Sequence, residues 1–466
     1  MPLEPPESGP PKQPGRIILP GSFEDDSESS ARESEPPPSD SGSRIILPPG
    51  SSVSAEQETL PDPPRLRPLE IVPARSGQQD LLIISDPLGV LPNPVALRIE
   101  VLELLQLLDG TLSLHDISAL IARESKDVRA AGFVRDLIAQ LDRLLLLDSP
   151  RFHEAYDALR AEYHRLEVRQ AVHEGGSYPA EPKEAQAFLG EHVKRAEAMK
   201  AAGSKPASRA PSALLVPHLD PRRAGPAIAR GWLELPAEDA TPLRVIVYGV
   251  GHSLFGAPYA LTRKHFETPF GRVDCDTRFV DALARRLGDV AYAGELAHRE
   301  EHSIEFQALY LKHRFPRRKV EVVPLLCGGF HALMDQGQTP RDAAPLETLI
   351  AAVRDTEREL GGATLHVASV DLSHVGTRFG DPEPDERVLR EIEAKDHEAL
   401  DAARRGDADG WYQSIASHED STRICGWGAT YMMLRCSEPP EGRLLDYEVS
   451  RENGGSVVTV GTLAWP

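Results

Sequence analysis

The chain has 466 residues, of which 40% are hydrophobic, a length sufficient for two or three domains. Its formal net charge of −20 argues against general affinity for nucleic-acid backbones or anionic membranes. Four Cys are too few for a disulfide scaffold, and neither a signal peptide nor a membrane-spanning apolar run is visible. We therefore expect a cytoplasmic protein that binds neither nucleic acid nor membrane.

Residues 1–68 are rich in Pro, Ser, Glu and Asp and poor in aromatic residues. Such a segment buries too little apolar surface to offset its ordering entropy, so we predict a disordered tail. The sequence Arg-Ile-Ile-Leu-Pro occurs in it twice, at residues 16–20 and 44–48. A repeated apolar motif in a polar tail is typical of a segment that adds as a strand to a protein partner's sheet. A local duplication without a role explains the repeat equally well.

Residues 80–150 are predicted to form a small α+β domain that is winged-helix-like. Residues 81–86 are typical of a strand, residues 94–108 and the stretches from about 114 and 128 of helices, and residues 144–149 of a closing strand. The phrase at residues 107–117 resembles PqqD-like peptide-recognition domains. Other winged helices bind DNA, but the predicted third helix mixes Arg129 and Arg135 with Asp127 and Asp136. We therefore favour a peptide or protein contact, with a structural cap as the alternative.

A charged amphipathic helix at residues 151–168 is expected to link this domain to a larger one, residues 169–466. Short apolar strands near residues 214–217, 245–250, 319–326 and 365–370 alternate there with helical segments such as 277–287 and 346–360. A strand pair at about 443–449 and 456–464 closes the chain. This alternation predicts an α/β fold with a mostly parallel or mixed sheet and helices on both faces.

Side chains with ligand chemistry follow several of these strands. His218 and His252 each end an apolar strand, and Asp371 and His374 follow a third. The carboxyl ends of parallel strands are where such sheets bind ligands. Cys425 precedes an apolar helix, whose dipole stabilises a thiolate. Two imidazoles and one anionic ligand suit a mononuclear transition metal, although each residue alone is explained more simply as structural.

Six motifs, in this order, carry a family resemblance. They are Pro217-His218, Gly251-His252, Glu267-Thr268-Pro269-Phe270-Gly271, Glu301-His302-Ser303-Ile304-Glu305, Ser369-Val370-Asp371-Leu372-Ser373-His374 and Ile424-Cys425-Gly426. The chain from about Arg169 to its C-terminus resembles the Memo family, whose bacterial members are also called AmmeMemoRadiSam system protein B. The resemblance implies an αβα sandwich similar to class III extradiol ring-cleaving dioxygenases.

The resemblance also implies roles for individual residues. His218, His252 and Cys425 would correspond to metal ligands, with iron (Fe2+) as the implied metal and copper as its competitor. His374 would replace the dioxygenases' acid/base histidine, and Asp371 would lie in the same pocket. His302, which lies in the fourth motif, completes the candidate catalytic residues.

Two functions are compatible with these residues. One is a metal-dependent redox enzyme that acts on a small aromatic compound or a modified peptide, with a radical-SAM protein as a partner by family analogy. The other is a non-catalytic protein that holds a peptide or a metal in the same pocket. After the first histidine the family usually continues with Ala-Gly-Tyr, whereas this chain has Leu219-Asp220-Pro221-Arg222. Charge therefore replaces an aromatic pocket wall.

Overall fold

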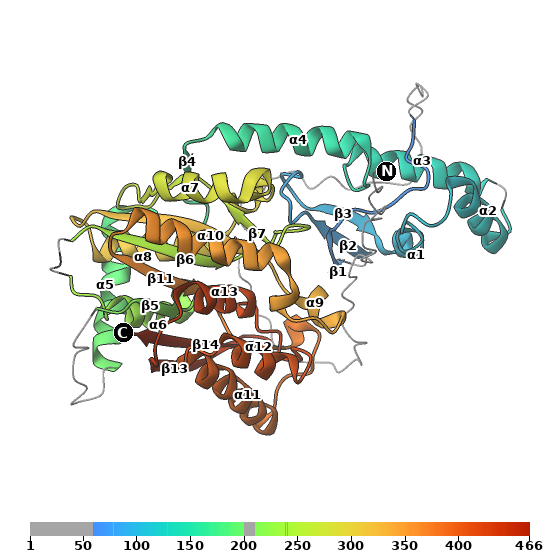
Figure 1. The fold of residues 1–466 in the computed structure, drawn as a ribbon. Helices are drawn as coiled ribbons and strands as arrows, with labels where there is room; N and C mark the ends of the chain where they lie inside the picture. Colours follow the sequence, from blue (N-terminus) through green and yellow to red (C-terminus); the bar gives the residue numbers. More distant parts are fainter. Residues whose placement is uncertain (1–58, 78, 128, 200–209, 238, 240) are drawn as a thin grey trace. The chain divides into compact units, whose positions relative to one another are not determined.

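The structure is a computed structural model that describes residues 59–77, 79–127, 129–199, 210–237, 239 and 241–466 (Figure 1). They belong to two compact units, one ending at Ala161 and the other starting at Glu162. Residues 1–58 of the predicted tail, including the repeated motifs at 16–20 and 44–48, lie outside the described residues. In the described part of the chain, no helix is long and apolar enough to cross a membrane.

The first unit combines a three-stranded antiparallel sheet with helices that follow it in the chain. Its elements are β1 (Glu70–Ser76), β2 (Gln79–Ser85), β3 (Val95–Arg98), α1 (Leu102–Gln106), α2 (Leu114–Ser125), α3 (Ala130–Arg143) and α4 (Pro150–Arg165), the last of which continues into the second unit. A capping box starts α2, because the Ser113 hydroxyl accepts from Asp116 N and the Asp116 carboxylate accepts from Ser113 N. Ile117 of α2 and Ile138 of α3 share one core with Leu82 and Ile84 of the sheet.

Two predicted elements of this unit were wrong. Residues 95–98, expected to be helical, form β3, in which buried Val95 and Leu97 alternate with half-buried neighbours. This two-residue period was hidden within a longer leucine-rich run. In residues 144–149, expected to be a strand or hairpin arm, Leu144 and Leu145 form a turn in which Leu145 has a φ of 58°, and only Leu147 pairs, in an isolated antiparallel bridge with Leu66. The strands of this sheet therefore precede the helices, and the winged-helix-like and PqqD-like assignments stay predictions.

Residues 59–68 were assigned to the disordered tail, but the structure places them in the first unit. Arg67 is buried, and its Nη1 lies 2.5 Å from Asp86 Oδ1. The backbone N of Leu66 donates to Leu108 O at 2.8 Å. The expectation of disorder is therefore wrong for these residues, because a buried ion pair and a backbone hydrogen bond hold them.

The second unit is built on a mixed sheet of nine strands. Seven strands follow the order β12-β14-β5-β11-β6-β10-β7, while β13 pairs with β14 and β9 with β10. The strands are β5 (Ala213–Val216), β6 (Leu243–Val250), β7 (Tyr259–Leu261), β9 (Asp274–Cys275), β10 (Val320–Cys327), β11 (Thr364–Ser369), β12 (His374–Gly376), β13 (Arg443–Glu452) and β14 (Ser456–Trp465). Two further strands, β4 (Val168–Arg169) and β8 (His265–Phe266), pair separately. The predicted α/β class with a mixed sheet is confirmed.

Helices cover both faces of this sheet (Figure 1). They are α5 (Pro182–Met199), α6 (Pro221–Trp232), α7 (Thr277–Leu287), α8 (His302–Arg314), α9 (His331–Asp335), α10 (Ala344–Leu360), α11 (Glu386–Arg404), α12 (Ala408–Ala416) and α13 (Trp427–Ser437). On one face of the sheet, α13 and α7 contact the strands, and α10 packs on these two helices. On the opposite face, α6 and α8 contact the strands, and α5 packs on α6. The central strands are buried on both faces, which explains their continuous apolar sequences.

Three neighbouring strands position the candidate site. The strands β5, β11 and β6 are adjacent and parallel, so their carboxyl ends lie at the same edge of the sheet. His218, Asp371 and His252 each lie two residues beyond the end of one of these strands. His374 lies five residues beyond the end of β11 and begins β12, which pairs with β14.

Candidate metal centre

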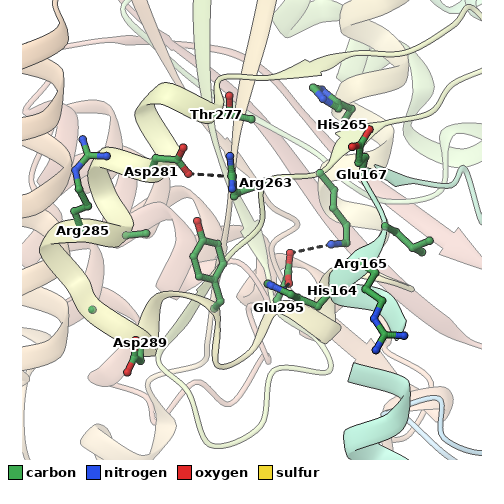
Figure 2. Close-up of a pocket in the computed structure, with 15 residues that line it drawn as sticks. His164, Arg165, Glu167, Arg263, His265, Thr277, Asp281, Arg285, Asp289 and Glu295 are labelled. Atoms are coloured by element: carbon green, nitrogen blue, oxygen red, sulfur yellow. Dashed lines mark hydrogen bonds and ion pairs between the residues drawn. The ribbon is translucent and has the colours of Figure 1, made fainter. Parts of the chain in front are cut away.

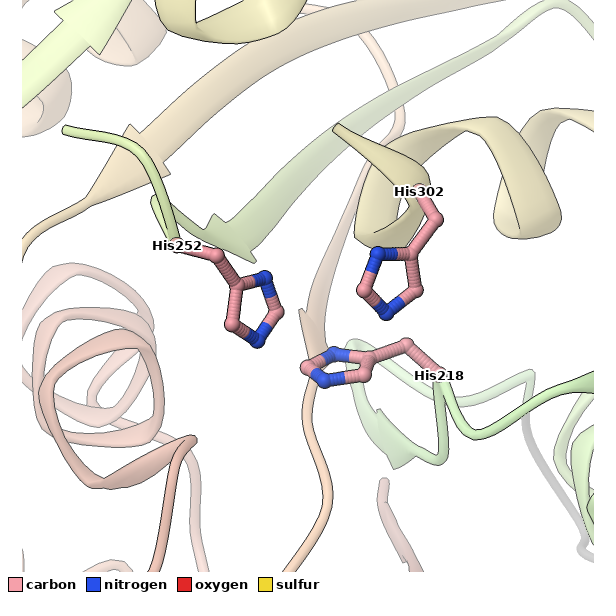
Figure 3. A group of neighbouring side chains, drawn as sticks. All are labelled: His218, His252 and His302. Carbon is pink, nitrogen blue, oxygen red and sulfur yellow. The ribbon is translucent and has the colours of Figure 1, made fainter. Parts of the chain in front are cut away.

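Three imidazole rings meet at the carboxyl edge of the sheet. Figure 3 shows the rings of His218, His252 and His302 converging from two strand ends and the start of α8. The ring centroids of His218 and His252 are 5.3 Å apart, and that of His302 lies 5.1 Å and 4.9 Å from them. One nitrogen from each ring lies within 4.8 Å of the other two. The structure thus groups two predicted metal ligands with a predicted catalytic histidine.

A second donor group shares His218 with the first. The donor atoms of His218, Asp371 and Cys425 also lie within 4.8 Å of one another. His218 Nε2 is 3.5 Å from Cys425 Sγ and 3.6 Å from Asp371 Oδ2. All three predicted ligands therefore lie in one cluster, which also contains His302 and Asp371.

The orientation of His218 is fixed by the strand beside it. His218 Nδ1 lies 2.8 Å from the carbonyl oxygen of Ser369. A carbonyl oxygen only accepts, so Nδ1 carries a proton and donates to it, and Nε2 faces Cys425. Asp371 Oδ1 accepts from the backbone N of both His218 and Leu219, each at 3.0 Å. In the structure Asp371 therefore fixes the turn that carries His218.

Glu301 fixes His252 in a similar way. Its carboxylate oxygens lie 3.0 Å and 3.1 Å from His252 Nδ1, and Oε2 accepts from His252 N at 3.1 Å. Glu301 is also the N-cap of α8, where Oε1 accepts from Ser303 N at 2.9 Å. A carboxylate on the far nitrogen is typical of metal-binding histidines, because it sets the tautomer and the ring orientation. Glu301 was not among the predicted ligands or catalytic residues, although it lies in the same motif as His302.

The charges of the cluster stabilise a thiolate beside imidazole groups. Burial raises the pKa of Cys425, but the charge of His218 and hydrogen bonds from His218 and His252 outweigh burial and lower it to about 6. Burial lowers the pKa of His218, but the charges of Asp371 and Cys425 raise it to about 9. For His302, burial dominates and holds the pKa well below its ordinary value, so its ring is neutral. Burial lowers the pKa of His252 too, but Glu301 and Cys425 raise it well above its ordinary value, so the thiolate is paired with two imidazolium groups. Both histidines would have to lose their Nε2 protons when a metal binds.

His374 lies beside the cluster and outside both donor groups. Its Nδ1 lies 2.9 Å from Leu372 O and 3.1 Å from Arg423 O, so Nδ1 carries the proton and Nε2 is the basic nitrogen. The ring packs edge-on against Phe379, with centroids 5.2 Å apart. Its charge contributes to the lowered pKa of Cys425. This arrangement suits an acid/base group better than a ligand.

His173, which precedes β5 in the chain and for which no role was predicted, also lies beside the cluster. The ring of His173 lies edge-on to His302, with centroids 5.7 Å apart. The backbone N of His173 donates to Glu305 Oε1 at 3.0 Å, and the same carboxylate accepts from Arg169 and Tyr178. Arg169, Tyr178 and Glu305 are all buried. These polar residues show no periodicity in the sequence, so only the structure brings them together.

A cavity of about 910 Å³ lies elsewhere in the second unit (Figure 2). It is lined by residues 164–167 and 263–265, by α7 and by residues 288–295, and it shares no lining residue with the histidine cluster. At its wall Lys264 Nζ lies 3.1 Å from Glu295 Oε1, and Arg263 Nε lies 3.0 Å from Asp281 Oδ1. Lys264 and Arg263 therefore pair with carboxylates of the protein itself.

The comparison with known proteins agrees with the motifs of the site. A family model described as Memo-like protein matches residues 169–464. The MEMO1 family protein of Aquifex aeolicus is 28% identical over 384 residues, which cover 80% of this chain and 92% of that protein. The MEMO1 family protein of Thermus thermophilus is 30% identical over 307 residues, covering 66% and 85%. That of Methanosarcina acetivorans is 26% identical over 303 residues, covering 63% and 97%. The chain belongs to the Memo family.

Proposed function

We propose that the protein is a metal-dependent redox enzyme that acts on a small aromatic compound or a modified peptide. Its metal would be a single iron ion held by His218, His252 and Cys425. The observation that carries the proposal is that acceptors engage Nδ1 of both histidines, Ser369 O in one case and Glu301 in the other. Both Nε2 atoms are thereby left for the space that Cys425 Sγ also borders.

The donor set fits the proposed ion. Two imidazoles and one thiolate are borderline to soft ligands, which suit iron or copper and suit calcium or magnesium poorly. Three protein ligands leave coordination positions open, as a catalytic site requires. Bound iron would supply the one-electron chemistry by which O2 reacts with an organic substrate. Copper is the competing metal, and the similarity to class III extradiol dioxygenases is part of the proposal.

The residues around the donors would support this chemistry in distinct ways. His374, with Nε2 as its basic nitrogen, would take or return a substrate proton. Asp371 would keep the His218 turn in place through the two amide hydrogen bonds. His302, neutral and stacked on His252, would accept a hydrogen bond from a substrate or serve as an additional ligand.

A non-catalytic adaptor is the alternative function. The separate first unit and the repeated motifs at 16–20 and 44–48 favour it, because neither is needed for the donor cluster. In an adaptor, the same pocket would hold a peptide or sequester a metal, and the tail would recruit a protein partner. A radical-SAM partner is proposed for either function by family analogy.

Metal analysis of protein purified without oxygen tests the proposal. We expect near-stoichiometric iron in the natural protein and a large loss of iron in the Cys425→Ala and His218→Ala variants. O2 consumption with catechol-like compounds then separates an enzyme from an adaptor that only stores metal. Protein without iron or copper, whose metal content is unchanged by Cys425→Ala, would overturn the proposal.

A further inference from the structure

The turn that delivers Cys425 has an unusual backbone. Glu419, Asp420 and Arg423 have φ values of 56°, 46° and 55°. This left-handed region is disfavoured for residues with a Cβ, because the Cβ approaches the following carbonyl oxygen. Several such residues within five positions persist only where the surroundings hold them, which is typical of functional sites.

Asp420 holds this turn from within. Its side chain is 2% exposed, although its pairing partner His331 is 56% exposed. Asp420 Oδ1 accepts from Ile424 N at 2.8 Å, which ties the carboxylate to the residue directly before Cys425. The backbone N of Asp420 donates to Ile415 O at 3.1 Å, at the end of α12. The carboxylate thus closes the loop between α12 and the cysteine.

His331 contacts the turn from a different element, the helix α9. It is the first residue of α9, and its Nε2 lies 2.9 Å from Asp420 Oδ2. Its ring also packs edge-on against Trp427, with centroids 5.2 Å apart. Trp427 is the first residue of α13 and follows Cys425 by two positions. One imidazole therefore contacts the chain on both sides of the cysteine.

The turn also packs closely on the strand edge that carries the cluster. A Cβ added at Gly426 would meet Val370 Cβ at 2.1 Å, so the backbone beside Cys425 lies directly on the residue before Asp371. Within the same turn, Arg423 O lies 3.1 Å from His374 Nδ1, and Arg423 Nε donates to His374 O at 3.1 Å. A shift of this turn would therefore displace the thiol and the proposed acid/base histidine together.

We propose that His331 and Asp420 are positioning residues that hold the Cys425 thiol at the donor cluster. Neither residue touches the cluster, so neither is a ligand. The two side chains hold the backbone of residues 420–427 in place. This backbone in turn keeps Cys425 Sγ 3.5 Å from His218 Nε2. The metal readout below rests on the proposed function, whereas the labelling readout needs only the metal-free protein.

The central variant is His331→Ala, because His331 is half exposed and its loss removes the imidazole from Asp420 Oδ2 while Ile424 N still donates to Oδ1. Asp420→Ala removes both hydrogen bonds at once. His331→Gln and Asp420→Asn are the rescue variants, since glutamine can still donate to Asp420 and asparagine can still accept from Ile424 N. His153→Ala is the matched control. His153 is 59% exposed and lies 2.8 Å from Asp148, in the first unit.

The first readout is iodoacetamide labelling of each cysteine in metal-free full-length protein at pH 9, followed by peptide mass spectrometry. We expect Cys425 to react at least threefold faster in His331→Ala and Asp420→Ala, because the thiol leaves its contacts with His218 and Asp371. The two rescue variants and His153→Ala should label like the natural protein. Cys275, Cys327 and Cys436 are buried and should stay slow, which excludes general unfolding. An unchanged Cys425 rate in His331→Ala, with the protein folded, overturns the proposal.

The second readout is the thiolate-to-metal absorption band on titration with Co2+. We expect the apparent affinity to fall about tenfold in His331→Ala and Asp420→Ala and to recover in the rescue variants. If the natural protein itself gives no such band, the proposed metal function fails, while labelling still decides the positioning role. A purely structural role would lower stability and leave both the band and the labelling rate of the folded protein unchanged.

Discussion

Glu301 contacts His252 twice, once at its backbone N at 3.1 Å and once at its ring Nδ1 at 3.0 Å. The carboxylate also caps α8, the helix that begins with His302. One side chain therefore sets the orientation of one histidine and the position of another. Glu301 is buried, and burial alone would raise its pKa. The charge of His252 and its hydrogen bond outweigh burial and hold the pKa well below the ordinary value, so Glu301 stays ionised in the folded protein.

The first prediction concerns this carboxylate. Glu301→Gln keeps an acceptor for His252 but removes the charge, and we expect metal affinity to fall by roughly 10- to 100-fold, as for other residues that orient a metal-bound histidine. Competition titration with a chelating dye measures the change. Glu300→Gln is the control, because Glu300 is an exposed neighbour whose side chain is 55% exposed. Equal affinity in both variants would show that Glu301 serves only as a helix cap.

The second prediction concerns the two amides that Asp371 binds. Asp371→Ala leaves the N–H groups of buried His218 and half-buried Leu219 without their acceptor, and each such loss costs about 1–3 kcal/mol. We expect the free energy of unfolding in urea to fall by about 2–6 kcal/mol. Asp371→Asn retains one accepting oxygen and should lose less than half as much. If the two variants are equally stable, the amides have found other partners.

The third prediction concerns the buried ion pair of Arg169 and Glu305, whose side chains are 1% and 0% exposed. Arg169→Met leaves the carboxylate uncompensated, which typically costs about 3–5 kcal/mol. The exposed pair of Arg387 and Glu391 is the matched control, and Arg387→Met should change stability by less than about 1 kcal/mol. Urea unfolding of both variants measures the difference. A small effect in both would mean that water enters the buried network.

The fourth prediction concerns pH. Asp396 is buried, and burial raises its pKa above 3.8 although hydroxyl groups of Ser373, Thr459 and Tyr447 donate to it. A raised pKa in the folded state means that the contribution of Asp396 to stability is complete at low pH and is lost as the pH rises through that pKa. The stability of the natural protein relative to Asp396→Asn should therefore fall as the pH rises above about 4, the ordinary pKa of an aspartate. Urea unfolding at several pH values measures it, and a difference independent of pH contradicts the assignment.

Much of the second unit could be predicted from its sequence. The helix expected at residues 277–287 coincides with α7 (Thr277–Leu287), because apolar residues at helical spacing and a following Gly define its core face and its end. The central strands could be predicted from their continuous apolar sequences, because helices cover both faces of the sheet and bury nearly every side chain of these strands. The predicted ligands His218, His252 and Cys425 were singled out from their places at the ends of elements, and the structure brings them together.

The remaining features depend on contacts that a sequence does not contain. Strand order decides that β11 lies between β5 and β6, and hence that Asp371 falls beside His218. The pairing of His331 with Asp420 joins residues 89 positions apart, with no periodicity to indicate it. In β3 the two-residue period was too short to be distinguished from a helix within a leucine-rich run. These features could not be predicted for one reason: which strands and side chains pair with each other depends on the three-dimensional fold.

His218, Asp371 and His252 each lie two residues past the end of a strand, so the spacing of the strands sets the spacing of these side chains. Neighbouring strands are about 4.8 Å apart, which places the backbones of His218 and His252 about 10 Å apart. Their side chains point toward each other, so the ring centroids are only 5.3 Å apart. Backbone hydrogen bonding, the least adjustable part of the fold, thus sets the spacing of the donors. Substitutions in the covering helices can reshape access to the centre while this spacing stays the same.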